Sequence, residues 1–219
     1  MTAPKPPEHA IWRDAEAPGD LSDRKEIMDA NLPADISELH EALEAAERDA
    51  ESLVGGLTEE EGGGRAEAGS WSVAECLDHL ATGNRVYLEA MVDPAERARE
   101  LGRTRRGPAK PGWLGGLFVS SLEPPPKWWA RMKAPRKIRP REAPPLAETF
   151  DRFMAVQADV RAFLLANADL DLAGIPFPNP FIPGIRFSLA TGLHVIAAHD
   201  RRHLLQAWGV RRAVLAADP

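Results

Sequence analysis

The sequence predicts an all-α fold, an antiparallel four-helix bundle with a long crossover between its second and third helices. Three observations support this prediction. Apolar residues recur every three or four positions in four separate segments, which is the period of a buried helical face. Two of these segments begin at a serine placed as an N-cap. No segment shows the two-residue alternation that is typical of a half-buried strand.

The composition is that of a globular protein with one core. The chain has 219 residues, of which 44% are hydrophobic and 27% charged, and this length suits one sizeable domain. No run has the length of a signal-peptide core or of a membrane span. The single cysteine, Cys76, cannot form an internal disulfide. We therefore expect a cytoplasmic protein.

The chain divides into a proline-rich arm, residues 1–33, and a bundle, residues 34–219. The arm contains five prolines and at most one short helix near residues 21–28. The first bundle helix follows it and ends at a pair of glycines, after which residues 58–69 form a loop. Its buried stripe consists of Ile36, Leu39, Leu43, Ala46, Ala50 and Leu53.

The second helix begins at a capping box. In it the Ser72 hydroxyl accepts from the amide of Glu75, and the Glu75 carboxylate accepts from the amide of Ser72. Trp71 precedes the cap and can pack on Cys76 as a hydrophobic staple. The apolar pattern continues to about Asp93.

A proline-rich crossover with short helical turns follows, at about residues 94–143. It is long enough to cross the bundle, so a simple up-and-down order of the helices is not required. Between residues 101 and 141 it holds eleven basic residues and one acidic residue, although the net charge of the chain is −6. This segment either has an anionic partner or offsets the acidic bundle. Its stretch 127–141 combines tryptophans with cations, which can stack on bases or lie at a membrane surface. Because no recognised nucleic-acid-binding fold accompanies it, we expect it to pack on the bundle, with neither nucleic acid nor membrane as partner.

The third helix is predicted over about residues 144–168 and the fourth over about 187–215, with Ser188 as the N-cap of the fourth. The fourth helix carries three of the six histidines within ten residues, His194, His199 and His203. Each helical residue advances by about 100°, so His199 and His203, four apart, share a face, whereas His194 lies about 140° away from His199. Gln206 falls on the His199 face, as an outer hydrogen-bond partner or a substrate-facing group.

Two imidazoles one turn apart can chelate a divalent ion, but a catalytic site usually has a third protein ligand and an open position. The best third candidate is His79, on the inward face of the second helix. Cys76 lies three residues before His79, as a neighbour that could approach the ion or face the substrate, although a free cysteine on an inner helix is usually a core residue. We expect His9 and His40 to lie on the surface.

The spacing of His199 and His203 also invites comparison with zinc peptidases. Asp200 occupies the position at which those enzymes place a glutamate. Aspartate is one methylene shorter, and at about 100° from His199 we expect it to cap or pair on the surface. This position therefore does not favour a peptidase.

Two motifs resemble the DinB-like superfamily of metal-binding four-helix bundles. They are WSVAECLDHL, residues 71–80, and HDRRHLLQ, residues 199–206. The resemblance extends over about residues 36–215 and implies that His79, His199 and His203 are metal ligands. It also implies a crossover after the second helix, a divalent ion such as zinc or nickel, and frequent homodimers.

The activities of that superfamily vary and include transferases and isomerases that use low-molecular-weight thiols. We therefore expect a small-molecule substrate and a metal-dependent hydrolase or thiol-dependent transferase, possible cofactors being the ion and a thiol. The alternative is a non-catalytic metal-stabilised bundle that serves as a binding or stress-response module. A fourth protein ligand would favour that alternative, whereas an open position would favour catalysis. The proline-rich arm and the basic crossover are longer than the superfamily core requires.

Overall fold

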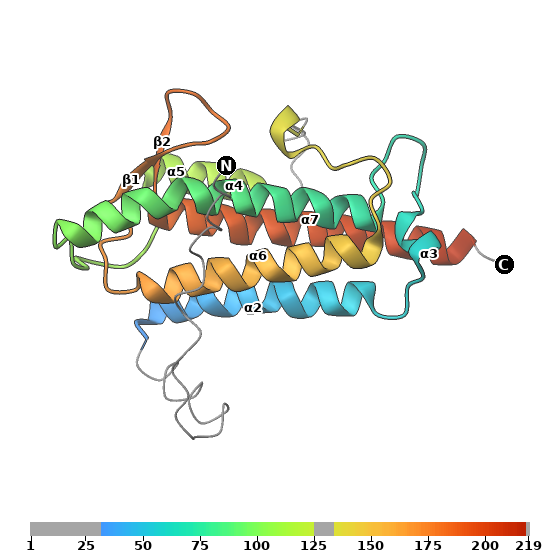
Figure 1. The fold of residues 1–219 in the computed structure, drawn as a ribbon, viewed down its shortest axis with the longest axis horizontal. Coiled ribbons are helices and arrows are strands. Elements are labelled where there is room, and N and C mark those ends of the chain that lie inside the picture. The colour runs from blue at the N-terminus through green and yellow to red at the C-terminus, as the bar shows by residue number, and fades with distance from the viewer. Residues whose placement is uncertain (1–31, 125–133, 218–219) are drawn as a thin grey trace, which may run out of the picture. The chain divides into compact units, whose positions relative to one another are not determined.

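The computed structural model describes residues 32–124 and 134–217, and four long helices dominate them (Figure 1). The expected short helix at residues 21–28 lies outside these residues. The predicted helical class is confirmed. The four long helices are α2 (Ala34–Val54), α4 (Val73–Glu100), α6 (Leu146–Ala166) and α7 (Leu189–Ala217).

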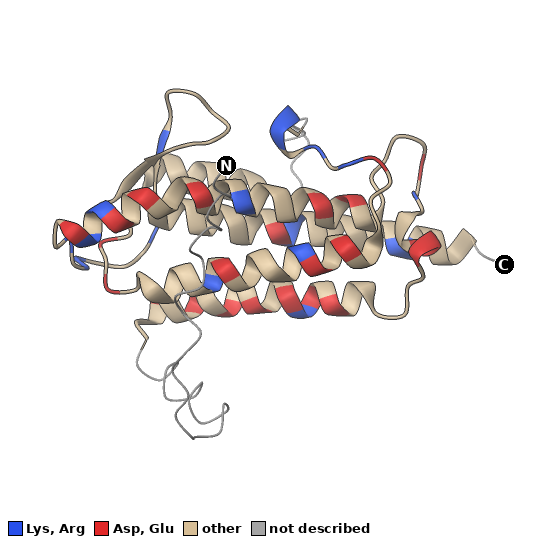
Figure 2. Cartoon of the chain, in the orientation of Figure 1, with Lys and Arg blue, Asp and Glu red and all other residues tan. Residues whose placement is uncertain are grey.

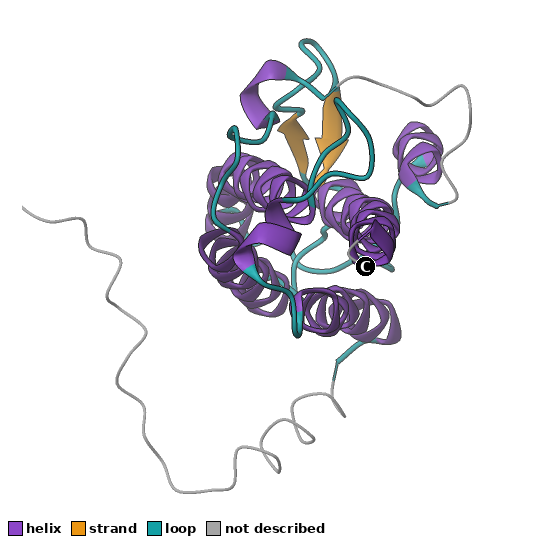
Figure 3. Ribbon diagram, turned by 90° about the vertical axis from the view of Figure 1, so that its right-hand side faces the viewer, coloured by secondary structure: helices purple, strands orange, loops and turns teal. Residues whose placement is uncertain are grey.

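The helix directions differ from the predicted antiparallel bundle. Contacts near both ends of α4 and α6 show that these two helices run parallel, because Asp78 pairs with Arg152 near their N-termini and Arg99 bonds Asn167 at their C-termini. Helices α2 and α7 are also parallel, since Trp208 near the end of α7 donates to Asp49 near the end of α2. Figure 3 looks along these helices. Residues 101–145 carry the chain back between α4 and α6, and a return segment of this length makes the parallel pair possible.

Helix α2 buries the predicted stripe of six apolar residues. His40 is buried as well, with only 5% of its surface exposed, so the expected surface position was wrong. The reason is helical phase, because His40 lies one turn after Ile36 and beside Leu39 on the buried face.

Helix α4 continues past the predicted end near Asp93. Pro94 lies inside it and removes one backbone hydrogen bond, which normally kinks or ends a helix. The following turns nevertheless bury Ala95 and Ala98, and Arg99 donates to the carbonyl of Ala166 on α6. Tertiary packing therefore outweighs the local penalty of the proline.

The return segment contains more helix than expected. It includes α5 (Trp113–Leu122) and a 3-10 turn, η2 (Arg136–Ile138). Helix α5 packs on α7, and Gly115 permits this approach because a Cβ there would lie 2.5 Å from the Thr191 hydroxyl. The basic segment partly offsets the acidic bundle, as Arg105 pairs with Asp35 and Arg141 with Asp78. Figure 2 shows acidic residues along the helices of the bundle. Residues 127–133 of the tryptophan-containing stretch lie outside the described part of the chain.

Three short elements were not predicted. Helix α3 (Glu59–Gly63) lies within the expected loop and begins at a capping box formed by Thr58 and Glu61. The strands β1 (Pro176–Pro178) and β2 (Arg186–Ser188) form an antiparallel pair before α7. Three residues are too few to show an alternation, and β1 contains two prolines, so no strand signal was available. No helix in the described ranges is both long and apolar enough to cross a membrane.

Candidate metal centre

Helix α7 holds two of the predicted ligands on one face. The helix begins as expected at Ser188, whose hydroxyl oxygen accepts from the amide of Thr191 at 3.1 Å. His199 and His203 follow one turn apart, with ring centroids separated by 4.6 Å. His194 lies apart from them, and its Nε2 bonds the carbonyl of Ala109 at 3.0 Å. The separation of His194 from the pair, predicted from helical phase, is confirmed.

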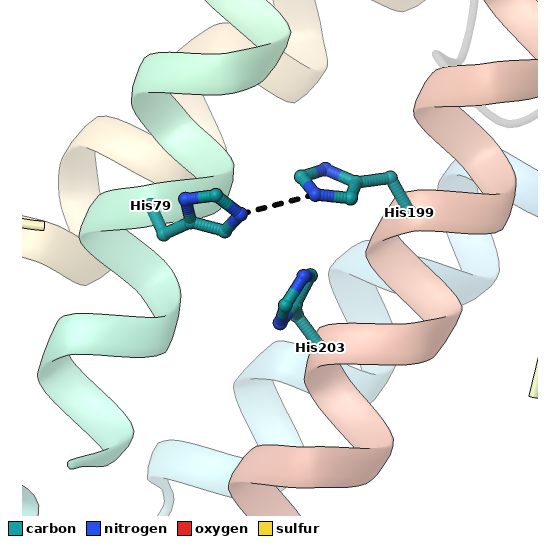
Figure 4. A group of neighbouring side chains, drawn as sticks. All are labelled: His79, His199 and His203. Carbon is teal, nitrogen blue, oxygen red and sulfur yellow. Dashed lines mark hydrogen bonds between the residues drawn. The ribbon is translucent and has the colours of Figure 1, made fainter. Parts of the chain in front are cut away.

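Helix α4 supplies the third imidazole. The predicted capping box is present, with both the Ser72 and the Glu75 bonds formed. Two turns later His79 points at α7, and its Nε2 lies 3.0 Å from the Nε2 of His199 (Figure 4). One ring nitrogen from each of His79, His199 and His203 lies within 4.8 Å of the others. The structure thus brings together the three residues that the sequence selected.

Hydrogen bonds outside the triad orient two of the rings. His79 Nδ1 lies 2.5 Å from the carbonyl oxygen of Ile138 in η2, and His203 Nδ1 lies 2.9 Å from Oε1 of Gln206. Since both partners are acceptors, each Nδ1 carries the proton and each Nε2 keeps its lone pair. Gln206 is the outer hydrogen-bond partner that helical phase suggested. Ile138 was missed, because it comes from a short 3-10 turn that no periodic pattern predicts.

The triad is neutral at physiological pH. Burial lowers the pKa of His79, and burial together with the neighbouring imidazoles lowers the pKa of His199 well below its usual value. The same two causes lower the pKa of His203 to about 3. Neutral imidazoles are the form that binds a metal ion.

The distances also fit an ion. A tetrahedral zinc ion with Zn–N bonds of about 2.0–2.1 Å separates its ligand atoms by about 3.3 Å. The 3.0 Å between the Nε2 atoms of His79 and His199 is close to that value. The three nitrogens lie within 4.8 Å of one another, so the wider separations would have to shorten by rotation of an imidazole when an ion binds.

Trp71 covers one side of the triad. Its ring centroid lies 4.7 Å from that of His79 and 5.6 Å from that of His203. The expected staple concerned only the packing of Trp71 at the helix start, so this second role was missed. The same aromatic ring now forms part of the wall beside the ligands.

Cys76 does not belong to the site. Its side chain is fully buried in the apolar core together with Val73, Leu77 and Leu80, and burial raises its pKa to about 12. A neutral core thiol neither faces a substrate nor approaches the ion as a thiolate. The expectation that Cys76 neighbours the ion is therefore not met: Cys76 lies three residues before His79, about 60° short of a full turn of α4, and it does not join the group of three histidines.

Asp200 was also misplaced by the sequence argument. It is fully buried rather than on the surface, and its carboxylate accepts hydrogen bonds from Asn84 at 2.9 Å and from Gln157 at 2.6 Å. The face about 100° from His199 is turned toward α4 and α6, so it is interior as well. Asp200 cannot serve as the general base of a zinc peptidase.

A carboxylate next to His79 fixes the return segment over the triad. Asp78 accepts from the backbone amide of Arg141 at 2.8 Å and from its guanidinium, and it also pairs with Arg152. These bonds hold the chain just after η2. They therefore help to place the Ile138 carbonyl against His79.

The triad lies where two hollows meet. One is an apolar cavity of about 220 Å³ that contains all three histidines in its lining. The other is a wider, more polar cleft of about 740 Å³ that reaches His203 and Gln206. Trp71, Ala134, Arg202 and His203 line both. The triad thus borders open space on two sides.

Comparison with known proteins adds one finding. A sequence model of the DinB superfamily matches residues 42–207, a range that includes all three histidines of the triad. No curated protein and no solved structure matches the chain.

Proposed function

This chain belongs to the DinB superfamily, and we propose that it is a metal-dependent enzyme in which His79, His199 and His203 bind a divalent ion beside a substrate cavity. The observation that supports this proposal most strongly is the open donor set. In the described ranges no other histidine, cysteine, aspartate or glutamate joins the three imidazoles. Three ligands at the wall of a cavity are typical of catalytic zinc sites, whereas structural sites have four.

The donor set also bears on which ion is bound. Three neutral imidazoles without a thiolate suit zinc and nickel alike. When bound, such an ion would act as a Lewis acid that lowers the pKa of a water or a thiol at its open position. The protein side chains provide the rest: Ile138 and Gln206 fix the imidazoles, and Trp71 limits access of water from one side.

Thiol-dependent transfer is the reaction that the site favours over hydrolysis. A thiol, with a pKa of about 8.5, needs a much smaller shift to ionise near neutral pH than water, with a pKa of about 15.7. The carboxylates nearest in sequence are engaged elsewhere, since Glu75 caps α4 and pairs with Arg65 and Asp78 binds two arginines. Asp200 is enclosed in the bundle. A reaction that needs no carboxylate as general base therefore fits best.

Metal content and coordination test the proposal. We expect elemental analysis of the purified protein to find about one divalent ion per chain, and the single alanine variants of His79, His199 and His203 to lose it. His194→Ala is the matched control, because it removes a histidine from the same helix without touching the triad. Equal metal content in all four variants would contradict the assignment.

Cobalt substitution distinguishes a catalytic site from the alternative, a non-catalytic metal-stabilised bundle. If a position is open, a small thiol such as 2-mercaptoethanol should bind cobalt(II) and produce a sulfur-to-metal charge-transfer band. A closed structural site would give a spectrum that the thiol leaves unchanged.

A further inference from the structure

The smaller cavity beside the triad is predominantly apolar. Its wall combines α5, the β1–β2 connection and α7 with Trp71 and η2. Four aromatic side chains belong to the lining, those of Trp71, Tyr87, Phe118 and Phe181. Ser121 and Arg202 are its polar residues besides the three histidines. The cavity is therefore suited to a hydrocarbon group next to the imidazoles.

The volume limits the size of that group. An engineered apolar cavity of about 150 Å³ holds a benzene molecule. A cavity of about 220 Å³ accordingly accommodates a phenyl ring with a few further carbons, but no long acyl chain. Gly83 keeps part of this space open, since a Cβ at that position would lie 3.5 Å from Cε1 of His199.

The wider cleft on the other side has a cationic character. Arg65 is paired with Glu75 there, which leaves Arg139, Arg202 and Glu142 as the other charged residues of its lining. Arg202 donates to the Ser121 carbonyl at 3.2 Å, which anchors its guanidinium between the two hollows. This excess of positive charge favours an anion over a cation in the cleft.

We propose that the substrate combines a compact apolar group, aryl or branched alkyl with about ten carbons or fewer, which enters the cavity, with a carboxylate that lies in the cleft near Arg139 and Arg202. The inference rests on the proposed function only in placing the reacting atom at the triad. The binding of such a molecule is measurable without turnover.

Calorimetric titration with 4-phenylbutyrate tests both the apolar group and the carboxylate of the proposed substrate. We expect it to bind more tightly than butyrate, which lacks the ring, and than 4-phenylbutan-1-ol, which lacks the charge. Gly83→Leu fills the cavity beside His199 and should weaken binding of phenylbutyrate by roughly tenfold or more. Gly209→Leu is the matched control on α7, because nothing lies within 4 Å of a Cβ there, and it should bind like the original protein.

The charge is tested separately. Arg139→Gln should weaken the binding of phenylbutyrate by roughly three- to tenfold and leave the binding of the alcohol unaffected. Arg202→Gln should weaken the binding of the acid more than that of the alcohol, because Arg202 lines both hollows. Phe118→Ala enlarges the cavity and should shift the preference toward a naphthyl acid, which keeps the size argument testable if Gly83→Leu does not fold. Equal affinity for butyrate and phenylbutyrate, or equal losses for acid and alcohol, would overturn the inference. Metal content, measured on each sample, separates such a result from a failure of metal binding.

Discussion

Two polar clusters lie inside the bundle, and they differ although they start at adjacent residues of α7. His199 belongs to the triad, whose ligand nitrogens face a cavity. Asp200 belongs to a closed network with Asn84 on α4 and Gln157 on α6. Both clusters join α4 to α7, but only the triad lines a cavity. Burial therefore does not distinguish the two clusters, whereas contact with a cavity does.

Burial of the closed network costs free energy. Burial raises the pKa of Asp200 to about 7, against the opposing effect of its two amide donors. The oxygens Oδ1 of Asn84 and Oε1 of Gln157 are buried without a hydrogen-bond partner. The hydrogen bonds of Asp200 tie α7 to α4 and α6 at the residue that follows His199.

Removing the closed network should have the largest effect on stability. Asp200→Ala leaves two buried amides without an acceptor and creates a small cavity, so we expect it to lower the free energy of unfolding by about 3 kcal/mol. Asp200→Asn should cost much less, because either Asn84 or Gln157 can flip its amide and accept from the new NH2 group through the oxygen that is now unpaired. Urea denaturation of the metal-free proteins measures both. Equal losses in the two variants would argue against a specific network.

Removing the metal should lower the free energy of unfolding by less than removing the closed network does. Chelation of the ion should lower the free energy of unfolding by about 2–3 kcal/mol, the linkage expected at a free ion concentration of about one hundred times Kd. In His199→Ala the chelator should change nothing. Thermal melts with and without chelator, followed by readdition of zinc, measure this difference. If the chelator destabilised His199→Ala as much as the original protein, the ion would bind elsewhere.

A third effect concerns the segment over the triad. Arg141→Gln loosens the contact with Asp78 and with it the position of the Ile138 carbonyl, so we expect metal affinity to fall by about tenfold with the three ligands intact. Arg136→Gln, on the exposed side of the same segment, is the control and should leave the affinity unchanged. Competition with a zinc indicator measures both values. Equal affinities in the two variants would show that the Asp78 contact does not orient His79.

The sequence was sufficient where local periodicity decides the structure. The stripe of α2, the caps at Ser72 and Ser188, and the shared face of His199 and His203 all follow from positions a few residues apart. The sequence was insufficient where packing between residues far apart in the chain decides the structure. No sequence pattern near Pro94 predicts that Ala95 and Ala98 are buried and that helix α4 continues. The burial of Asp200 depends on Asn84 and Gln157, which are 116 and 43 residues away.

The smallest expected effect is that of metal on the alkylation of Cys76. This measurement tests whether Cys76 belongs to the core or to the metal site. Its pKa of about 12 means that the thiol stays neutral up to alkaline pH in the folded protein. We expect iodoacetamide at pH 9 to modify it slowly in the native state and rapidly in urea, where the pKa returns to about 8.5. Mass spectrometry of timed samples measures the two rates. Addition of metal should leave the native rate almost unchanged, since the side chain points into the core. A strong slowing by zinc would instead return Cys76 to the ligand set and close the position that catalysis requires.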